Sequence, residues 1–313
     1  MSVDTRATID PPDALEGGTE ATPAVTLRAA SHGDRNFTSM GFLVLLWLSL
    51  AFGIVVLAVL LVDTFIDGLP RLDSRMLTSY TSQVFPDRAG ARAPILGSAF
   101  VITVTAAMAV PIGVGAAVYL EEFASKTSAF ARMVELNVQN LAAVPAIIYG
   151  MLTAGLVVTV GIRRNSILSG AIALALLILP VVIVTTREAL RAVPTEIRQG
   201  SLALGATQMQ TVARQTLPAA IPGIATGVIL SLSRAIGEAA PLLLLGGLVF
   251  VQYDPNGLLS GFSTLPIQIY DWSSRPQVAF QTAASAAIII LLVLLMAMNA
   301  VAIVIRNRSQ RRW

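Results

Sequence analysis

Residues 187–218 read REALRAVPTEIRQGSLALGATQMQTVARQTLP, and this charged, helix-forming insert lies between two apolar runs long enough to cross a bilayer. Its first part continues the preceding apolar run until Pro194 permits a turn. A second short helix can begin near Thr195, with Glu196 in its first turn, as helix capping favours. The insert therefore leaves the membrane as a helix and turns soon afterwards.

The centre of this insert is Gly205, which lacks a Cβ and so allows a left-handed turn or the close approach of another backbone. Residues 206–216 are expected to form another helix, which Leu217 and Pro218 end. The pattern predicts two short helices hinged at a glycine. Such an element projects from the membrane and can seat in a groove of a soluble subunit, from which it takes force.

The composition indicates that the bilayer is the solvent for most of the chain. Of the 313 residues, 55% are hydrophobic and only 12% are charged, and the mean hydropathy is +0.74. One soluble core cannot bury so much apolar surface. The absence of cysteine and the single histidine, His32, argue against disulfides, thiolate metal sites and histidine-based catalysis. We expect no catalytic residue, metal or cofactor.

Six apolar segments reach the length of about 20 residues that a membrane-spanning helix needs. They cover residues 42–62, 95–120, 136–160, 167–186, 219–249 and 279–305. None alternates with a period of two, so helices are favoured over a barrel. The prediction is an all-α polytopic helical bundle. We expect its helices to be kinked at prolines, which lie at Pro111, Pro145, Pro180, Pro222 and Pro241.

The distribution of basic residues predicts the orientation in the membrane. On the side of the termini and the insert lie 13 lysines and arginines, against 7 on the other side. Cytoplasmic loops carry the excess of positive charge, so both termini and the insert should be cytoplasmic. A chain with an isoelectric point near 9.7 could bind nucleic acid, but arginines placed between apolar runs fit membrane orientation better.

The remaining segments are assigned from their composition. Residues 1–39 lack an apolar period and are predicted to be a mobile cytoplasmic tail, and residues 40–313 the transmembrane domain. The first apolar run is long enough to stay as a membrane anchor rather than a cleaved signal. Residues 63–94 should be an external loop packed on the bundle. Residues 253–276 form the second external connection, and a loop without a partner is the simpler interpretation of both.

The insert resembles the cytoplasmic loop of the membrane-spanning permease subunits of bacterial ABC importers. That loop has the pattern Glu-Ala-Ala, three residues, Gly, nine residues, Ile, one residue, Leu-Pro. The glycine and the Leu-Pro pair are present at the right spacing, whereas Gln199 replaces the glutamate and Gln215 the isoleucine. The resemblance assigns coupling to a cytoplasmic ATPase to Gln199, Gly200, Ser201, Gly205, Leu217 and Pro218.

Three further blocks resemble the phosphate-specific (PstA) members of these permeases. They are VPIGVGAAVYLEEF at residues 110–123, NVQNLAAVPAIIYG at residues 137–150 and RAIGEAAPLL at residues 234–243. The similarity extends over roughly residues 40–305. It implies the type I (MetI-like) permease fold, with a core at about residues 95–305, and the ATP-driven import of inorganic phosphate through the bacterial plasma membrane.

The resemblance also implies the partners of the chain. They are a homologous second permease (PstC-like) in a heterodimer, a pair of cytoplasmic ATPases (PstB-like) and an external phosphate-binding protein (PstS-like). No Gly-x-x-x-x-Gly-Lys-Ser/Thr motif occurs in the sequence, so the chain itself should not hydrolyse ATP. Closure of the ATPases would move the insert, and rigid helices would carry that movement to the membrane gates.

Arg234 and Glu238 are the candidate residues of the translocation path. Both lie deep in the fifth apolar run, where a charge costs several kcal/mol unless it is paired or hydrated. A guanidinium presents planar donors suited to phosphate oxygens. Glu238, four residues on and on the same helical face, could hold Arg234 between ligand passages. In the alternative interpretation the two charges only neutralise each other. Arg187 could receive the anion or serve as a positive-inside anchor.

Two other functions are compatible with parts of this pattern. A permease for sulfate, molybdate or another oxyanion would share the architecture. A passive anion channel or an intramembrane enzyme would use Arg234 and Glu238 without an ATPase. Such a protein has no need of the insert that contains Gly205, so copurification of an ATPase that depends on Gly205 separates this class from the importer.

Overall fold

The structure is a computed structural model that describes residues 37–125, 128–247 and 250–309. Most of the predicted tail, residues 1–36, lies outside them. The helices are, in chain order, α1 (Phe37–Gly68), η1 (Leu69–Arg71), α2 (Ser74–Thr78), η2 (Pro86–Arg88), α3 (Arg92–Val118), η3 (Tyr119–Phe123), α4 (Ala129–Ala142), α5 (Ala146–Thr159), α6 (Ile167–Arg191), α7 (Thr195–Ala203), α8 (Gln208–Thr211), η4 (Val212–Thr216), α9 (Leu217–Ile236), α10 (Ala240–Leu244), α11 (Leu265–Ser273) and α12 (Val278–Ser309). Within the described residues an isolated bridge between Ser166 and Gly261 is the only β pairing, which confirms the all-α prediction.

Contacts divide the chain into two units, residues 1–56 and residues 57–313. The described part of the first unit is the beginning of α1, which continues without a break into the second. The stretch Met40–Arg71 is long and apolar enough to cross a membrane, as are the helical stretches that contain α3, α6, α9 and α12. Five of the six predicted spans are therefore represented by such helices.

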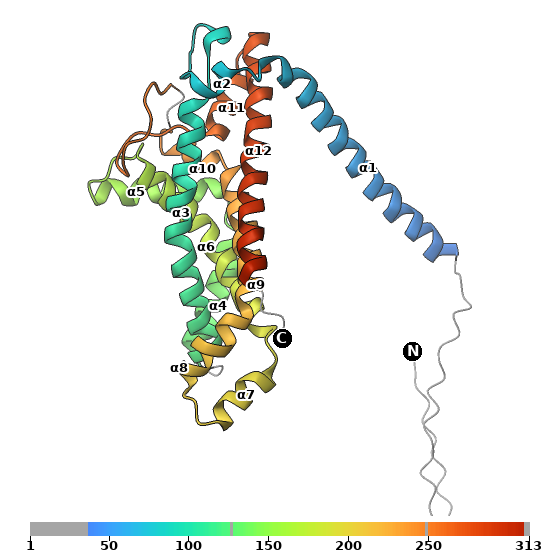
Figure 1. The fold of residues 1–313 in the computed structure, drawn as a ribbon, viewed down its shortest axis with the longest axis vertical. Helices are drawn as coiled ribbons and strands as arrows, with labels where there is room; N and C mark the ends of the chain where they lie inside the picture. The colour runs from blue at the N-terminus through green and yellow to red at the C-terminus, as the bar shows by residue number, and fades with distance from the viewer. Residues whose placement is uncertain (1–36, 126–127, 248–249, 310–313) are drawn as a thin grey trace, which may run out of the picture. The chain divides into compact units, whose positions relative to one another are not determined.

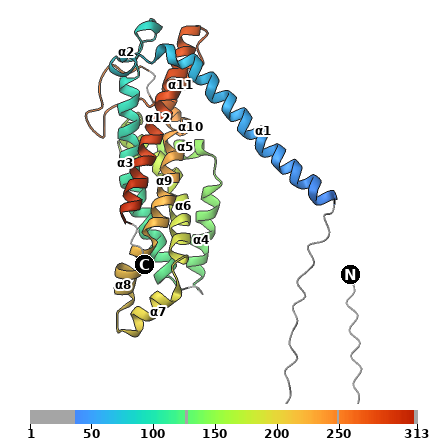
Figure 2. The ribbon, with the colours of Figure 1, turned by 45° about the vertical axis from the view of Figure 1, so that its right-hand side comes forward.

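Helix α6 is the centre of the second unit. Figures 1 and 2 show α3, α6, α9 and α12 running along the same bundle, with α2 and α11 at one end and α7 and α8 at the other. Helix α6 packs against α3, α9, α5 and α4. Of its most apolar 18 residues, 67% are buried, whereas the corresponding share of α12 is 17%. The apolar surface of α12 is therefore available to lipid or to another membrane subunit.

Small residues let α9 approach α6 closely, as the spacing of Gly223 and Gly227 suggests. A Cβ built on Gly223 would lie 2.7 Å from the Cβ of Ala189, and one built on Gly227 would lie 2.3 Å from Oγ1 of Thr185. Both distances are shorter than a van der Waals contact. The two glycines therefore set the separation of these helices.

The predicted span over residues 136–160 is broken at Pro145, one of the predicted kink positions. This segment consists of α4 and α5, which meet at an angle of 110°. Pro145 precedes α5 and has no N–H to continue the hydrogen bonds of α4. The Tyr149 hydroxyl donates to the Leu141 carbonyl at 2.5 Å and so ties the two helices together across the bend.

The fifth apolar run is also not one continuous helix. Helix α9 ends at Ile236, and the short helix α10 begins after a break at residues 237–239. Pro241 lies in the first turn of α10, where its missing N–H is tolerated. A Cβ built on Gly150 of α5 would lie 2.7 Å from Cα of Pro241, so α10 packs tightly on α5. Three of the other predicted kink prolines lie inside continuous helices, at Pro111, Pro180 and Pro222.

Leu217 and Pro218 do not end the helix of the insert, contrary to the prediction. Helix α8, η4 and α9 form one helical stretch from Gln208 to Ile236. The turn η4 is a π-helix in which the Leu217 N–H donates to the Val212 carbonyl, five residues back. The wider π-turn lets the helix continue through Pro218, which cannot donate a hydrogen bond of its own.

The two polar connections pack against the bundle, as predicted for the first of them. Met76 and Ala89 from residues 63–94 are fully buried beside Trp272 and Phe280. The second connection is more than a loop, because it contains α11, whose Trp272 has no exposed surface. Residues 253–276 therefore contain a packed helix as well as loop segments.

An ion pair joins this second connection to the first residue of α3. Arg92 Nε donates to Oδ1 of Asp254 at 3.0 Å, and Arg92 Nη2 donates to Oδ2 of Asp254 at 2.5 Å. The hydrogen bond from Arg92 lowers the pKa of the Asp254 carboxyl. The pair holds the segment before α11 against the bundle end.

Candidate functional site

The insert turns at a glycine between α7 and α8, as the sequence predicts, but only α7 is a separate short helix, because α8 continues through η4 into α9. Gly205 follows α7 with a φ of +85°, the left-handed conformation that favours glycine. The Ala206 N–H donates to the Ser201 carbonyl at 3.2 Å and closes the end of α7. Thr207 and Gln210 then form a capping box at the start of α8. The local sequence therefore sets the whole turn.

The predicted coupling residues lie in two groups. Gln199 and Gly200 are exposed on α7, while Ser201 is half-buried and its hydroxyl lies 2.9 Å from that of Thr211. This hydrogen bond joins α7 to α8. The two helices enclose a groove of about 480 Å³, lined by Glu196, Ile197, Gly200, Ser201, Leu204, Ala206, Gln210, Arg214 and Gln215.

Apolar side chains project from the turn of the insert. Leu204 is 91% exposed, and Leu202 and Met209 are also exposed. Exposed apolar side chains on a polar element are typical of a protein contact surface. Leu217 and Pro218 form the first turn of α9, and Leu217 lines an apolar pocket of about 460 Å³ together with Met209.

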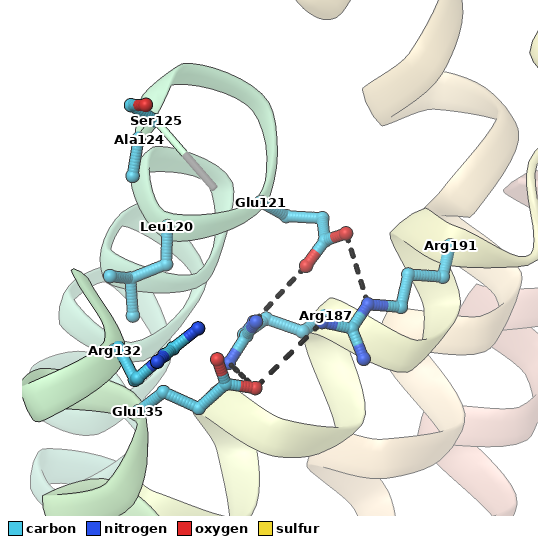
Figure 3. Close-up of a pocket in the computed structure, with 8 residues that line it drawn as sticks. All are labelled: Leu120, Glu121, Ala124, Ser125, Arg132, Glu135, Arg187 and Arg191. Atoms are coloured by element: carbon cyan, nitrogen blue, oxygen red, sulfur yellow. Dashed lines mark hydrogen bonds and ion pairs between the residues drawn. The ribbon is translucent and has the colours of Figure 1, made fainter. Parts of the chain in front are cut away.

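A cluster of charged side chains lies where α3, α4 and α6 meet, and the sequence interpretation did not assign it (Figure 3). The carboxylate of Glu121, at the end of α3, accepts hydrogen bonds from Arg187 Nε at 3.2 Å and from Arg191 Nε at 3.0 Å. The carboxylate of Glu135 in α4 forms an ion pair with Arg187, with 3.0 Å between Oε1 and Nη1. A cavity of about 370 Å³ opens beside these groups, with Arg132 and Ser125 in its wall. The cluster ties three helices together.

Arg187 is accounted for by this cluster. Its side chain is only 11% exposed and lies between two carboxylates, those of Glu121 and Glu135. Its charge is therefore neutralised within the protein, which fits neither a free anion receptor nor a simple surface anchor. The spacing of Arg187 and Arg191 on one helical face was the available signal, but Glu121 and Glu135 lie more than 50 residues earlier in the chain.

Arg234 and Glu238 lie at the break between α9 and α10. Arg234 is in the last turn of α9, and Glu238 follows the end of that helix. Their side chains form an ion pair with a separation of 3.8 Å between Nε and Oε1, and they are 57% and 25% exposed. The pair is therefore formed, as predicted, but at a helix end rather than along one continuous helical face.

The two predicted groups are far apart in the subunit. Arg234 follows Leu217 by 17 residues of α9, which corresponds to about 26 Å of helix. The ion pair of Arg234 therefore lies towards the end of α9 opposite the insert. Any effect of the insert on this pair has to pass through helices.

Comparison with known proteins identifies relatives for nearly the whole chain. The profile of the family described as "Binding-protein-dependent transport system inner membrane component" matches residues 34–313. A protein of Mycobacterium leprae named phosphate transport system permease protein PstA is 39% identical over 59% of this chain and 60% of its own length. Proteins of the same name are 31% identical in Xylella fastidiosa, over 77% of this chain and 83% of that one, and 30% identical in Yersinia pestis, over 84% and 88%.

Solved structures with the same fold are more distant in sequence. A subunit of a bacterial alginate ABC transporter superposes with a TM-score of 0.59 at 16% identity, over 89% of this chain and all of that one. A subunit of the MetNI methionine ABC transporter in an inward-facing conformation superposes with a TM-score of 0.54 at 22% identity, over 71% of this chain and 96% of that one. At these identities the likeness shows the fold.

Proposed function

The chain belongs to the binding-protein-dependent transport system inner membrane components, and from this premise we propose that it is a membrane-spanning permease subunit of an ATP-driven ABC importer for inorganic phosphate. The observation that carries the proposal is the match to phosphate permeases over most of the chain, with 30% identity across 84% of it in the case of Yersinia pestis. The family match over residues 34–313 supports the same role. The protein is a multi-pass component of the plasma membrane.

The partners follow from this role. The proposed assembly contains a homologous second permease, a pair of cytoplasmic ATPases and an external phosphate-binding protein. The turn between α7 and α8 is the proposed contact with the ATPase, because Leu202, Leu204 and Met209 expose apolar surface there. Helix insertion into a groove of a soluble subunit uses such a surface. The chain contributes this contact and a part of the phosphate path, and its partners hydrolyse the ATP.

The orientation is part of the proposal. We place both termini and the insert in the cytoplasm, following the excess of positive charge on their side. Within the second unit, the last residues of α12 and the helices α7 and α8 lie towards the same end of the bundle, which supports this assignment (Figure 1). Arg306 of α12 donates to the hydroxyl of Thr226 at the middle of α9.

We place Arg234 and Glu238 in the phosphate path. Arg234 is 57% exposed although it belongs to a helix of the membrane domain. An exposed guanidinium is expensive against lipid and inexpensive against water or a companion subunit. The separation of 3.8 Å between Arg234 and Glu238 indicates a weak ion pair. The oxygens of an arriving phosphate can replace the Glu238 carboxylate as the partner of Arg234.

The Arg234→Gln variant is expected to lower phosphate uptake on the order of tenfold or more, because a hydrogen bond to a charged group contributes roughly 1.5–3 kcal/mol. The measurement is the initial rate of uptake by vesicles that contain equal amounts of assembled transporter. Arg163→Gln is the matched control, since Arg163 is an exposed arginine of the turn between α5 and α6. Unimpaired uptake by an assembled Arg234→Gln transporter would remove this residue from the path.

The function itself is tested by uptake of labelled phosphate into vesicles with and without this chain, in the presence of the three partners. Import should require the chain, ATP and phosphate together. Competition by sulfate or molybdate instead of phosphate would assign a different oxyanion. Phosphate flux that does not require ATP would assign a passive channel and contradict the importer.

A further inference from the structure

Arg198 of α7 binds the end of α6. One terminal nitrogen of its guanidinium donates to the Val193 carbonyl at 2.8 Å, and the other donates to the Leu190 carbonyl at 2.7 Å. Carbonyls at the end of a helix attract cations, because the helix leaves its last acceptors free and carries a partial negative charge there. The planar guanidinium reaches both carbonyls at once. Arg198 therefore fastens α7 to α6.

The same guanidinium binds the end of α3. The nitrogen that contacts Leu190 also donates to Oε1 of Glu122 at 2.8 Å. Glu122 lies in η3, the π-helical turn that continues α3. The side chains of Arg198 and Glu122 are only 20% and 9% exposed, so water screens this ion pair weakly.

Helix α8 reaches the same point. The Gln208 side-chain amide at the start of α8 donates to the main-chain carbonyl of Glu122. Glu122 therefore accepts one hydrogen bond from Arg198 at its carboxylate and one from Gln208 at its main-chain carbonyl. One residue at the end of α3 contacts both helices of the insert.

Apolar packing of α7 is slight in comparison. None of the nine residues of α7 is buried. Ile197 is half-buried and packs on the cluster that contains Leu190 and Val193. Polar contacts, which are directional, therefore define how α7 is oriented on the bundle.

We infer that Arg198 and Glu122 form the link through which the insert moves α3 and α6 as one body. The inference rests on the proposed function, since it supposes that an ATPase moves the insert. Arg198 is a positioning residue in this scheme and touches neither phosphate nor nucleotide. Helices α3 and α6 pack along one another, so a displacement of Arg198 reaches both helices through a contact that holds them together.

The first test measures the orientation of the insert and does not depend on transport. The chain has no cysteine, so spin labels at Ala203→Cys in α7 and Ile112→Cys in α3 report one distance in the full-length chain in lipid nanodiscs. Both positions are exposed. We expect a narrow distance distribution that broadens in Arg198→Ala and in Glu122→Gln. Arg198→Lys, which keeps the charge but not the planar donors, should give an intermediate width.

The second test measures coupling in the assembled transporter, as phosphate imported per ATP hydrolysed. Changes within coupling networks alter coupling by roughly 0.5–2 kcal/mol, which corresponds to a loss on the order of tenfold for Arg198→Ala, with ATP hydrolysis retained. Glu188→Gln is the matched control. Its carboxylate is 66% exposed and pairs with Arg191 of the same helix at 3.5 Å, so it links no two elements.

The outcomes separate this inference from the proposed function. Narrow distances and wild-type coupling in Arg198→Ala and Glu122→Gln would overturn the link. If Arg198→Ala does not assemble, Arg198→Lys and Glu122→Gln decide by the same two measurements. A wild-type complex that imports no phosphate, while the distance distributions still respond to Arg198, would instead reject phosphate import and leave the link in place.

Discussion

Replacing Gly97 by alanine is expected to destabilise the folded subunit strongly. Gly97 lies in α3, and a Cβ at this position would be 2.0 Å from the main-chain oxygen of Ser263 and 3.2 Å from its carbonyl carbon. Backbone atoms cannot move aside as the end of a flexible side chain can. The neighbouring Ser98 hydroxyl accepts the Leu265 N–H at 2.8 Å, which holds the segment before α11 in this position.

The expected loss in the free energy of unfolding is about 3 kcal/mol or more, the upper range for an overpacked interior. The measurement is the thermal midpoint of the purified subunit in detergent, followed by size-exclusion chromatography of the heated sample. Gly115→Ala is the matched control in the same helix, because a Cβ there meets nothing within 4 Å. Equal midpoints for the two variants would show that α3 and the segment before α11 can separate without cost.

Arg187→Gln is expected to destabilise the subunit by about 3 kcal/mol, because removing one member of a buried ion network strands the charge of its partners. Glu121, which is only 11% exposed, would retain its ion pair with Arg191 and lose the one with Arg187. Glu135 would lose its contact with Arg187 at 3.0 Å. Chemical unfolding in detergent micelles measures the change in free energy.

The control for this second change is Glu188→Gln, which removes the ion pair between Arg191 and the 66% exposed side chain of Glu188. It should lower the free energy of unfolding by less than about 1 kcal/mol. The neutral double variant Arg187→Leu with Glu121→Leu should recover part of the lost stability, since apolar residues can replace a buried ion pair. Equal destabilisation by Arg187→Gln and Glu188→Gln would show that the cluster is solvated rather than buried.

Much of the candidate site could be predicted because its signals are local. The turn of the insert depends on Gly205, Thr207 and Gln210, which lie within six residues of one another. The close approach of α9 to α6 follows from the spacing of Gly223 and Gly227, although the identity of the partner helix does not. The sequence predicts a kink at Pro241 but not the end of α9 at Ile236, which sets Arg234 and Glu238 at a helix end.

The sequence by itself determined where the apolar segments lie, the hinge of the insert and the family, since these depend on composition and on short-range conformational preferences. The tertiary structure alone decided the 110° bend between α4 and α5, the burial of α11, and the partners of Arg187 and Arg198. Hydropathy reports how long an apolar run is and carries no information about its direction. A charge finds its partner through the packing of helices distant in the chain, and that packing is a property of the whole bundle.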